Sequence, residues 1–594
     1  MLGSFFARAI RPLTQIIINE EFDLKKLSKF FRGYVKESIL GPLFKLLEAS
    51  LELIVPLVIA AIIDKGILTN DKPYVIKMCL VLVLLGAVGL GFSVTAQYYA
   101  AKASCGFSAR MRSALFAHIE TLSYSEIDSI GTSTLITRMT SDSNQVQTGI
   151  NLTLRLLLRS PFVVFGAMIM AFTIDFKSAL TFAVVIPLLS LVVFGIMLAS
   201  MPLYKKSQTR LDAVLKKTRE NLHGARVIRA FSREDDEIRS FKEKNESLTD
   251  IQKFVGKISA LMNPTTYILI NFAVIFLIYV GALRVDAGDL TQGQVVALYN
   301  YMGQILVELI KLANLIISIS KALASASRIE AVFDTESSIE YGSEELKKLD
   351  SGIEFSGVSL KYRGSSENSV SGISFTAKRG ETVGIIGGTG AGKTSLINLI
   401  PRFYDATEGS VKINGIDISK YGKDTLRDKI SLVPQNAYLF AGTIRDNIKF
   451  GKNDATDEEI LKAIEIAQGS EIVEAKGGLD ARIEQGGKNL SGGQRQRLTI
   501  ARALVNKPEI LILDDSASAL DYATDARLRK AIKENTADSA VFIVSQRASS
   551  VMHADKILVL DDGECVAMGS HEELLNSSAL YREIYETQFG TEGV

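Results

Sequence analysis

The pattern of hydrophobic and polar residues divides the chain into two unlike halves. Roughly the first 325 residues carry long runs without charge, whereas the remainder reads like a soluble α/β domain. Residues 78–101, 178–204 and 258–283 are free of charged side chains and are long enough to cross a bilayer. Each of these three runs predicts a transmembrane helix.

Three further apolar runs, near residues 38–63, 156–174 and 290–320, are interrupted or bordered by charge. The charged residues in or beside them include Lys45, Glu48, Glu52, Asp175, Glu308 and Lys311. Together with the clean runs they predict six membrane spans. The alternative, buried helices of a soluble domain, is disfavoured because so many runs of this length gather in one half of the chain.

The distribution of Lys and Arg predicts the orientation of the spans. Residues 204–257 contain fourteen of them and residues 102–159 contain six, whereas the loops near 64–77, 175–177 and 284–289 contain five together. Because basic segments stay on the cytoplasmic side, we expect the first two segments there. An even number of spans then places both termini in the cytoplasm, at the cell membrane.

The two basic segments are too long to be simple loops. Residues 102–155 and 204–257 contain few helix breakers and carry apolar residues at three- and four-residue spacing, which predicts helical hairpins. Arms of about 25 residues would extend roughly 35–40 Å. We expect the turns, near His118–Ser123 and near Asp212–Lys217, to contact a cytoplasmic domain. An amphipathic elbow helix at about 24–36 is expected along the inner membrane surface.

Carboxylates inside membrane spans need an explanation because each is costly in lipid. Glu48 and Glu52 lie one helical turn apart, and Glu308 lies on the sixth span. One interpretation is a polar cavity wall that receives cationic or amphipathic substrate. The other is that these groups lie in water-filled cytoplasmic extensions of the helices. Both remain open for Glu48, and the cavity is favoured for Glu308.

The second half of the chain predicts a separate domain. Residues 326–350 lose hydrophobic character and gain charge, as a linker does, so we expect a transmembrane domain over 1–325 and a second domain over 351–594. A strand pattern starts at Ile353, and strands then alternate with helices. The predicted fold is therefore a six-helix, all-α transmembrane domain with long cytoplasmic hairpins, followed by an α/β P-loop domain.

The glycine-rich stretch GGTGAGKTS lies between an apolar run and a helical segment. It comprises Gly387, Gly388, Thr389, Gly390, Ala391, Gly392, Lys393, Thr394 and Ser395. Strand, loop and helix in this order form the context of a Walker A motif, whose backbone N–H groups cradle phosphates. Lys393 is expected to reach the β- and γ-phosphates, and the Thr394 hydroxyl to bind Mg²⁺. The alternative, a glycine turn that binds nothing, is disfavoured by the intact motif. The predicted ligands are ATP and Mg²⁺.

Further motifs follow at the ends of later apolar runs. Gln435 follows one such run and can meet Mg²⁺ or the attacking water, and Asp514 ends a buried strand pattern, as a Walker B carboxylate does. Tyr362 can stack on a purine base, although a lone Tyr more often belongs to the core. A second anion cradle at a helix N-terminus is formed by Leu490, Ser491, Gly492, Gly493 and Gln494.

Walker A, LSGGQ and Walker B in this order resemble the ATP-binding-cassette domain, and the six spans before them resemble an exporter half-transporter. The resemblance implies a dimer in which ATP lies between Walker A of one chain and LSGGQ of the other. It also implies that Tyr362 stacks on adenine, Gln435 is the Q-loop residue and Asp521 belongs to the D-loop. Gln485–Gly487 would then sense the membrane helices of the partner.

Two residues depart from the family pattern. The family has a catalytic Glu after the Walker B Asp and a switch His after the last strand, but this chain has Asp515 and Gln546. Asp is one methylene shorter than Glu, and Gln cannot become cationic. We therefore expect slow hydrolysis at this site. Since LSGGQ is intact, the chain resembles the degenerate-site subunit of heterodimeric bacterial multidrug exporters, whose partner supplies the working Glu and His.

Composition adds little to these motifs. The net charge of +1 gives no argument for nucleic acid, and the three Cys residues are far apart. ATP-driven export of amphipathic drugs or lipids is the predicted function. The alternatives are a nucleotide-gated regulatory or channel-like subunit, which the short linker disfavours, and a homodimeric lipid flippase. A peptide exporter would need a Cys/His protease segment that the sequence lacks, and a DNA-acting ATPase is excluded by the membrane half.

Overall fold

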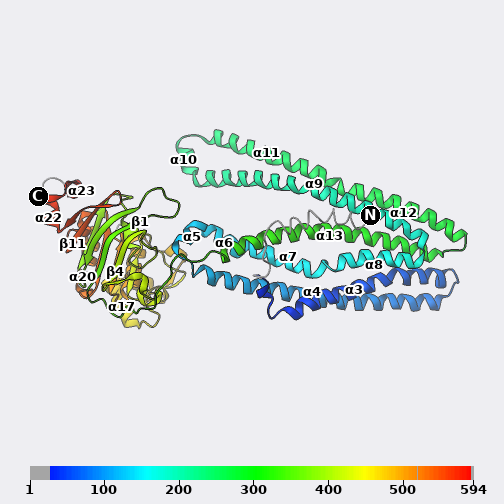
Figure 1. Ribbon diagram of the computed structural model, residues 1–594, viewed down its shortest axis with the longest axis horizontal. Helices are drawn as coiled ribbons and strands as arrows, with labels where there is room; N and C mark the ends of the chain where they lie inside the picture. The colour runs from blue at the N-terminus through cyan, green and yellow to red at the C-terminus, as the bar shows by residue number, and fades with distance from the viewer. Residues whose placement is uncertain (1–26, 518, 590–594) are drawn as a thin grey trace. The chain divides into compact units, whose positions relative to one another are not determined.

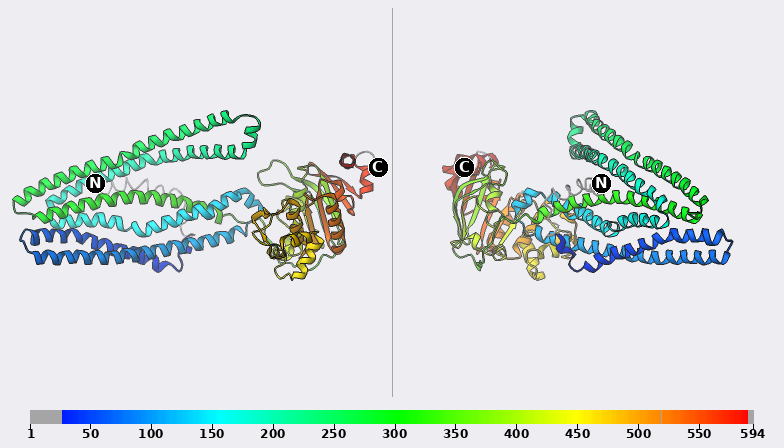
Figure 2. Two further views of the ribbon diagram at one scale, coloured as in Figure 1. Left: turned by 180° about the vertical axis from the view of Figure 1, so that it is seen from behind. Right: turned by 45° about the vertical axis from the view of Figure 1, so that its right-hand side comes forward.

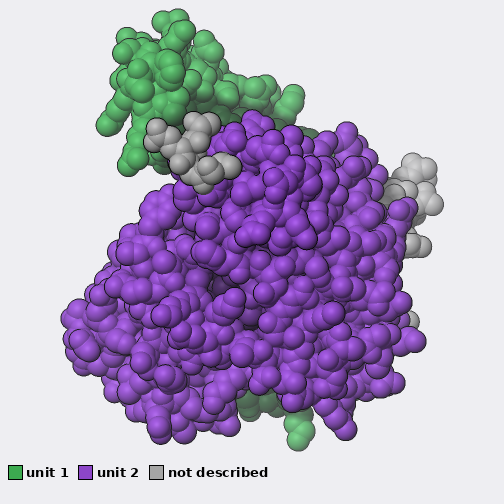
Figure 3. Space-filling view, turned by 90° about the vertical axis from the view of Figure 1, so that its left-hand side faces the viewer, with its two compact units in different colours: residues 1–120, 133–334 green, residues 121–132, 335–594 purple. Residues whose placement is uncertain are grey.

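The computed structural model describes residues 27–517 and 519–589 and divides into two compact units. Unit 1 comprises residues 1–120 and 133–334, and unit 2 comprises residues 121–132 and 335–594 (Figure 3). The short segment 121–132 therefore belongs to the same unit as the second half of the chain, although it comes from between two membrane helices.

Unit 1 is all-helical. Its longer helices are α3 (Val35–Ile62), α4 (Lys72–Ile119), α7 (Ser143–Leu156), α8 (Arg159–Ile174), α9 (Phe176–His223), α11 (Glu234–Ala260), α12 (Met262–Asp286) and α13 (Gln292–Phe333). Shorter helical segments are η1 (Lys29–Phe31), η2 (Ile63–Ile67), α6 (Thr132–Thr137), η3 (Arg138–Asp142) and α10 (Ala225–Ala230). Among the described residues, six helical stretches are long and apolar enough to cross a membrane, which confirms the predicted spans.

Helix α13 packs against several others in the bundle. It contacts α3, α7, α8, α9 and α12, and its buried residues Leu298, Tyr301 and Ile305 belong to the apolar core of the unit. The hydroxyl of Tyr301 donates to the Leu53 carbonyl of α3 at 2.6 Å.

The predicted hairpins form, but their turns lie elsewhere. Helix α9 runs through Asp212–Lys217 without a break and ends at His223, and α10 and α11 follow it (Figure 1 and Figure 2). The prediction near Asp212–Lys217 is wrong because this stretch contains no residue that stops a helix. Gly224 ends α9, and Ser232 adopts a φ of 51° before α11 begins. The first hairpin reverses after His118–Ser123, over α5 (Tyr124–Ile130).

The elbow and the end of the membrane unit also differ from expectation. Residues 24–26 of the elbow lie outside the described residues, and the rest is the short turn η1 followed by Gly33, whose φ of 89° interrupts the expected helix. Helix α13 continues to Phe333, beyond residue 325. Arg328, within the predicted linker 326–350, lies on α13 and pairs with Asp142.

Unit 2 contains two large sheets. The antiparallel sheet has the order β2 (Val370–Ala377), β1 (Ile353–Leu360), β4 (Glu408–Ile413) and β5 (Ile416–Asp417). The second sheet has the order β12 (Glu564–Gly569), β11 (Lys556–Asp561), β3 (Thr382–Gly387), β10 (Ala540–Ser545), β9 (Ile510–Asp514) and β6 (Ile430–Val433). It is parallel except for β12. Strands β7 (Gly442–Thr443) and β8 (Arg482–Ile483) form a small pair.

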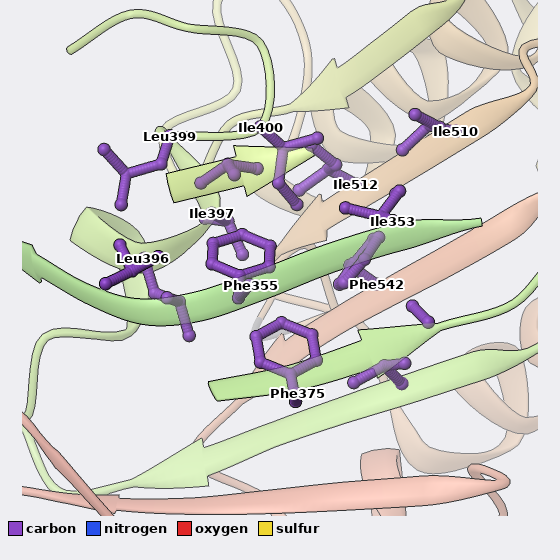
Figure 4. Close-up of a cluster of buried hydrophobic side chains, with 14 of the residues drawn as sticks. Ile353, Phe355, Phe375, Leu396, Ile397, Leu399, Ile400, Ile510, Ile512 and Phe542 are labelled. Carbon is purple, nitrogen blue, oxygen red and sulfur yellow. The ribbon is translucent and has the colours of Figure 1, made fainter. Parts of the chain in front are cut away.

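Helices of unit 2 include α14 (Lys393–Ile397), α15 (Lys423–Arg427), α16 (Ile444–Lys449), α17 (Asp457–Ile466), α18 (Ser470–Lys476), α19 (Gly492–Leu504), α20 (Tyr522–Asn535), α21 (Ala548–Val551), α22 (His571–Ser577) and α23 (Ala579–Phe589). Apolar side chains fill the space between the sheets. Phe355 of β1 stacks on Phe375 of β2 with ring centroids 4.5 Å apart, and Phe375 meets Phe542 of the parallel sheet (Figure 4). This confirms the predicted α/β domain.

Candidate nucleotide site

The register of the parallel sheet brings three strand ends together. Ser545 of β10 pairs with Ile386 of β3, and Val544 pairs with Asp514 of β9. The carboxyl ends of parallel strands form one edge, where α/β proteins bind ligands. The residues that follow these strands, beginning at Gly388, Asp515 and Gln546, therefore meet at one edge of the sheet.

The glycine loop after β3 is shaped by a close approach to the neighbouring chain segment. Gly392 has a φ of 86°, and a Cβ there would lie 2.2 Å from the Ser369 carbonyl oxygen. Only glycine fits this conformation and this gap. Helix α14 begins at the next residue, Lys393, whose ammonium donates to the carbonyls of Gly387 at 2.9 Å and Gly388 at 2.5 Å.

Two adjacent carboxylates face this loop from the end of β9. The Thr394 hydroxyl donates to the Asp514 carboxylate at 3.0 and 3.2 Å. Burial raises the pKa of Asp514, and the nearby charge of Asp515 raises it further, against the opposing effect of Thr394 and Lys393. Burial likewise lowers the pKa of the Lys393 ammonium, although both carboxylates oppose this. The site thus concentrates charge in a desolvated space.

Asp515 has an unusual backbone. Its φ is 44°, its N–H donates to the Val544 carbonyl at 2.9 Å, and its carbonyl accepts from the buried Gln496 amide at 3.3 Å. Burial raises the pKa of the Asp515 carboxyl, while a hydrogen bond with Gln435 and the charge of Arg547 oppose that shift. The left-handed conformation is costly for a residue other than glycine, and two backbone hydrogen bonds hold it.

Gln546 follows β10 in a loop that the last helix holds in place. The Gln588 amide of α23 donates to the Gln546 carbonyl at 2.9 Å and accepts from the Ala548 N–H at 2.8 Å. The Ser545 hydroxyl accepts from the Arg547 N–H at 3.0 Å. Sequence reasoning missed Gln588, because it lies far along the chain in no recognisable motif.

A cavity of about 220 Å³ unites these groups. Its lining includes the predicted residues Thr389, Gly390, Gly392, Lys393, Thr394, Ser395, Gln435, Asp514, Asp515 and Gln546. It also includes Ser369 and Val544, which the sequence analysis did not single out. Carboxylate, hydroxyl and amide oxygens suit Mg²⁺ as ligands, and an ammonium with backbone N–H groups at a helix start suits a phosphate chain.

An aromatic pair lies beside the loop. The Tyr362 hydroxyl donates to Ser395 Oγ at 3.0 Å, and its ring meets Tyr404 edge to face at a centroid distance of 5.0 Å. The Tyr404 hydroxyl donates to Asp128 of α5 at 2.6 Å, and Tyr124 of α5 packs on Phe403. Helix α5 is therefore the contact element of the first hairpin, a few residues beyond the expected His118–Ser123.

Comparisons with known proteins agree with this architecture. Residues 38–309 match the ABC transporter transmembrane region, and residues 370–518 match the ABC transporter model. The chain is 36% identical to the ABC transporter ATP-binding protein YfiB of Bacillus subtilis over 571 residues, covering 96% of this chain and 99% of that protein. This chain belongs to the ABC transporter family.

Other relatives carry more specific names. The probable multidrug resistance ABC transporter YheI of Bacillus subtilis is 33% identical, with 95% of this chain and 97% of that protein covered. The ATP-dependent lipid A-core flippase of Desulfotalea psychrophila is 35% identical, with coverage of 80% and 83%. A bacterial Atm1-family ABC exporter with ATP bound has the same fold at a TM-score of 0.76 and 22% identity, covering 96% of this chain and 100% of that one. This ABC transporter chain is thus a half-transporter with one transmembrane and one ATPase domain.

The signature segment of this ABC transporter starts helix α19. Ser491 Oγ accepts from the Gln494 N–H at 3.3 Å, and Gln494 Oε1 accepts from the Ser491 N–H at 3.0 Å, which forms a capping box. Within the described residues, none of Leu490, Ser491, Gly492, Gly493 and Gln494 lines the cavity of this chain. Asp521 caps α20 by accepting from the Thr524 N–H at 2.9 Å, and it does not line that cavity either.

The membrane carboxylates of the transporter are ion-paired. Glu308 is 3% exposed and accepts from Arg159, from Ser160 at 2.8 Å and from Lys311 at 2.9 Å. It therefore does not line an open cavity in this conformation, contrary to expectation. The reason is that Arg159, at the start of α8, reaches it. Glu48 pairs with Lys45, and Glu52 pairs with Arg159.

Proposed function

We propose that this chain is one half of a dimeric exporter that uses ATP to move amphipathic drugs or lipids across the cell membrane. Its relatives include proteins named as a multidrug resistance transporter and as a lipid A-core flippase. The Lys and Arg distribution supports an orientation with both termini and the ATPase domain in the cytoplasm. Closure of two ATPase domains on ATP would open the membrane cavity outward, and hydrolysis would reset it.

In this proposal the cavity holds ATP with Mg²⁺. Lys393 would turn from the loop carbonyls to the β- and γ-phosphates, and Thr394, Asp514 and Gln435 would hold the metal. The buried carboxylate of Asp514, with its raised pKa, fits a divalent cation because the cation would stabilise the ionised form. When bound, Mg²⁺ neutralises charge on the phosphates. Tyr362 stacks on adenine, since it lies next to Ser395 of the same loop.

We further propose that this site binds ATP but hydrolyses it slowly. The observation that carries this is the meeting of Asp515 and Gln546 in one cavity. The short Asp515 side chain already bonds Gln435. It is one methylene shorter than the Glu that would take a proton from the attacking water, and proton transfer requires hydrogen-bond reach. Gln546 can donate to the γ-phosphate but contributes no positive charge.

The partner is then a different ABC half-transporter with the usual Glu and His. Its Walker motifs would face the intact Ser491–Gln494 segment of this chain and form the efficient site. This segment supports the proposal because its helix cap is complete and its residues lie outside the chain's own cavity.

The test compares the chain purified alone with the chain co-purified with its partner. We expect the single chain to bind ATP with little turnover, and the pair to hydrolyse ATP faster when amphipathic substrates are added. Robust ATPase activity of the chain alone would favour a homodimer and contradict the heterodimer. If both Lys393→Ala and Thr394→Ala bound ATP as well as the wild type, the assignment of the site itself would be contradicted.

A further inference from the structure

A network of charged side chains joins three helices inside the membrane unit. Arg159 of α8 donates to Glu52 of α3 at 2.6 Å and to Glu308 of α13 at 2.5 Å. Lys311, one turn along α13, donates to the same oxygen of Glu308 at 2.9 Å. The neighbouring Lys45–Glu48 pair on α3 adds one charge of each sign. The network therefore contains three cations and three carboxylates and has no net charge.

The centre of the network is closed and its two ends are open. The side chains of Arg159 and Glu308 are 7% and 4% exposed. Glu52 and Lys311 are 41% and 43% exposed, and each is anchored to the buried pair by a single ion pair. One exposed anionic group and one exposed cationic group are thus linked through the buried Arg159–Glu308 pair.

The open ends do not face lipid. Charged groups within membrane spans face the bundle interior or a water-filled cavity. Large apolar side chains are exposed elsewhere on the unit, as is typical of lipid-facing positions; examples are Leu84 on α4 and Phe272, Ile275 and Ile278 on α12. The surface that carries Glu52 and Lys311 is therefore a polar surface available to a solute.

The pairing of these ends determines which solute they favour. Breaking Arg159 from Glu308 would leave buried charge uncompensated, so a ligand must use the open ends. A simple cation would be attracted to Glu52 but repelled by Lys311 and Arg159. A simple anion would be attracted to Lys311 but repelled by Glu52. A headgroup with both charges satisfies Glu52 and Lys311 together. We propose that this surface binds the zwitterionic headgroup of an amphipathic substrate, with its ammonium on Glu52 and its phosphate or carboxylate on Lys311. This rests on the proposed export function and specifies the headgroup charge of its amphipathic substrate.

Binding can be measured directly, because the chain contains no Trp. Val307, next to Glu308 on α13 and 49% exposed, is replaced by Trp as a reporter in the full chain in nanodiscs. Three probes carry brominated hydrocarbon chains of the same length, which quench Trp fluorescence: a lysophosphatidylethanolamine, a lysophosphatidylglycerol and an alkyltrimethylammonium. We expect the zwitterionic probe to bind about tenfold more tightly than either singly charged probe, the effect of one charge-assisted hydrogen bond.

Two variants separate the ends. Glu52→Gln is expected to weaken binding of the zwitterionic probe about tenfold and to strengthen binding of the anionic probe. Lys311→Gln is expected to weaken binding of the zwitterionic probe by a similar factor and to strengthen binding of the cationic probe. Both leave Arg159 paired with Glu308. Glu37→Gln on α3 and Lys321→Gln on α13 are matched controls, since neither belongs to the network, and should change no preference.

Equal binding of all three probes, tightest binding of the cationic probe, or an unchanged preference in both variants would overturn the inference. ATP-driven movement of the probes across vesicles by the dimer is measured in parallel. Movement of the probes without headgroup preference would overturn this inference but not the proposed export function. Absence of movement for all three probes, with the zwitterion bound as expected, would overturn the proposed export function while the binding site stands.

Discussion

At the scale of single residues, two hydrogen bonds of the Gln588 side chain on α23 hold the loop that carries Gln546. The glycine loop, Gln435, Asp514, Asp515 and Gln546 were all identified from motifs, and the parallel register places them along one edge. What the motifs could not indicate was support from elsewhere in the chain. Gln588 on the last helix is such a case, because its role depends only on where α23 packs.

The two hydrogen bonds of the Gln588 side chain predict that it positions the loop that carries Gln546. Gln588→Ala removes both bonds and should lower ATP turnover at this site severalfold while its ATP affinity changes little, since Gln546 loses alignment rather than phosphate contact. Single-turnover kinetics of the dimer, together with hydrogen exchange of the Ala548 amide, are the measurements.

The conservative and control variants make this prediction specific. Gln588→Glu keeps the acceptor for Ala548 but not the donor for Gln546 and should show an intermediate effect. Glu583→Gln, on the same helix, should behave as wild type. Unchanged exchange at Ala548 in Gln588→Ala would refute the positioning role.

A second residue-scale prediction concerns Asp515. Asp515→Glu restores the longer carboxylate and should raise hydrolysis at this site only partially, because Gln546 still replaces a His. Single-turnover hydrolysis in a dimer whose other site is inactivated measures this. Full recovery to the rate of a consensus site would show that Gln546 imposes no limit.

At the scale of elements, periodicity predicted the six spans and the strand alternation, but not where each hairpin turns. The position of a turn depends on single residues such as Gly224, which ends α9. The spacing of apolar residues along the hairpin does not indicate this position. The same applies to α5, which lies in unit 2 through contacts of Tyr124 and Asp128 that appear only once the chain is folded.

The α5 contact yields a prediction about stability. Tyr404→Phe and Asp128→Ala each remove one partner of a 2.6 Å hydrogen bond and should each lower the free energy of unfolding of unit 2 by about 1 kcal/mol. The double mutant should cost less than the sum, because the same bond is lost. Denaturant unfolding followed by Tyr fluorescence measures the coupling, and strict additivity would contradict the bond.

At the scale of the whole molecule, the distribution of Lys and Arg predicts an orientation that can be tested by labelling. In a background without the exposed Cys79 and Cys105, a Cys at Thr69 should react with an impermeant maleimide in intact cells. A Cys at Ser207, on α9, should react only after permeabilisation. The opposite pattern would invert the topology and place the ATPase domain outside.

The central claim is that the chain's own site is slow and that its signature serves a fast site on the partner. Gly492 tests the second part well, because among the described residues a Cβ there meets the Ala519 side chain at an ordinary contact distance of 3.6 Å. Gly492→Ala is therefore the steric control for Gly492→Asp, which adds a carboxylate where the partner's γ-phosphate must dock.

The decisive measurement is steady-state ATPase activity of Asp515→Ala and Gly492→Asp in the same purified dimer. We predict that Asp515→Ala retains most of the turnover, because the partner's site keeps its own base. Gly492→Asp should lose on the order of a hundredfold in rate, as when an electrostatic contact is removed at a transferring phosphate. Abolished turnover in Asp515→Ala with mild loss in Gly492→Asp would contradict the assignment of the two sites and the heterodimer with it.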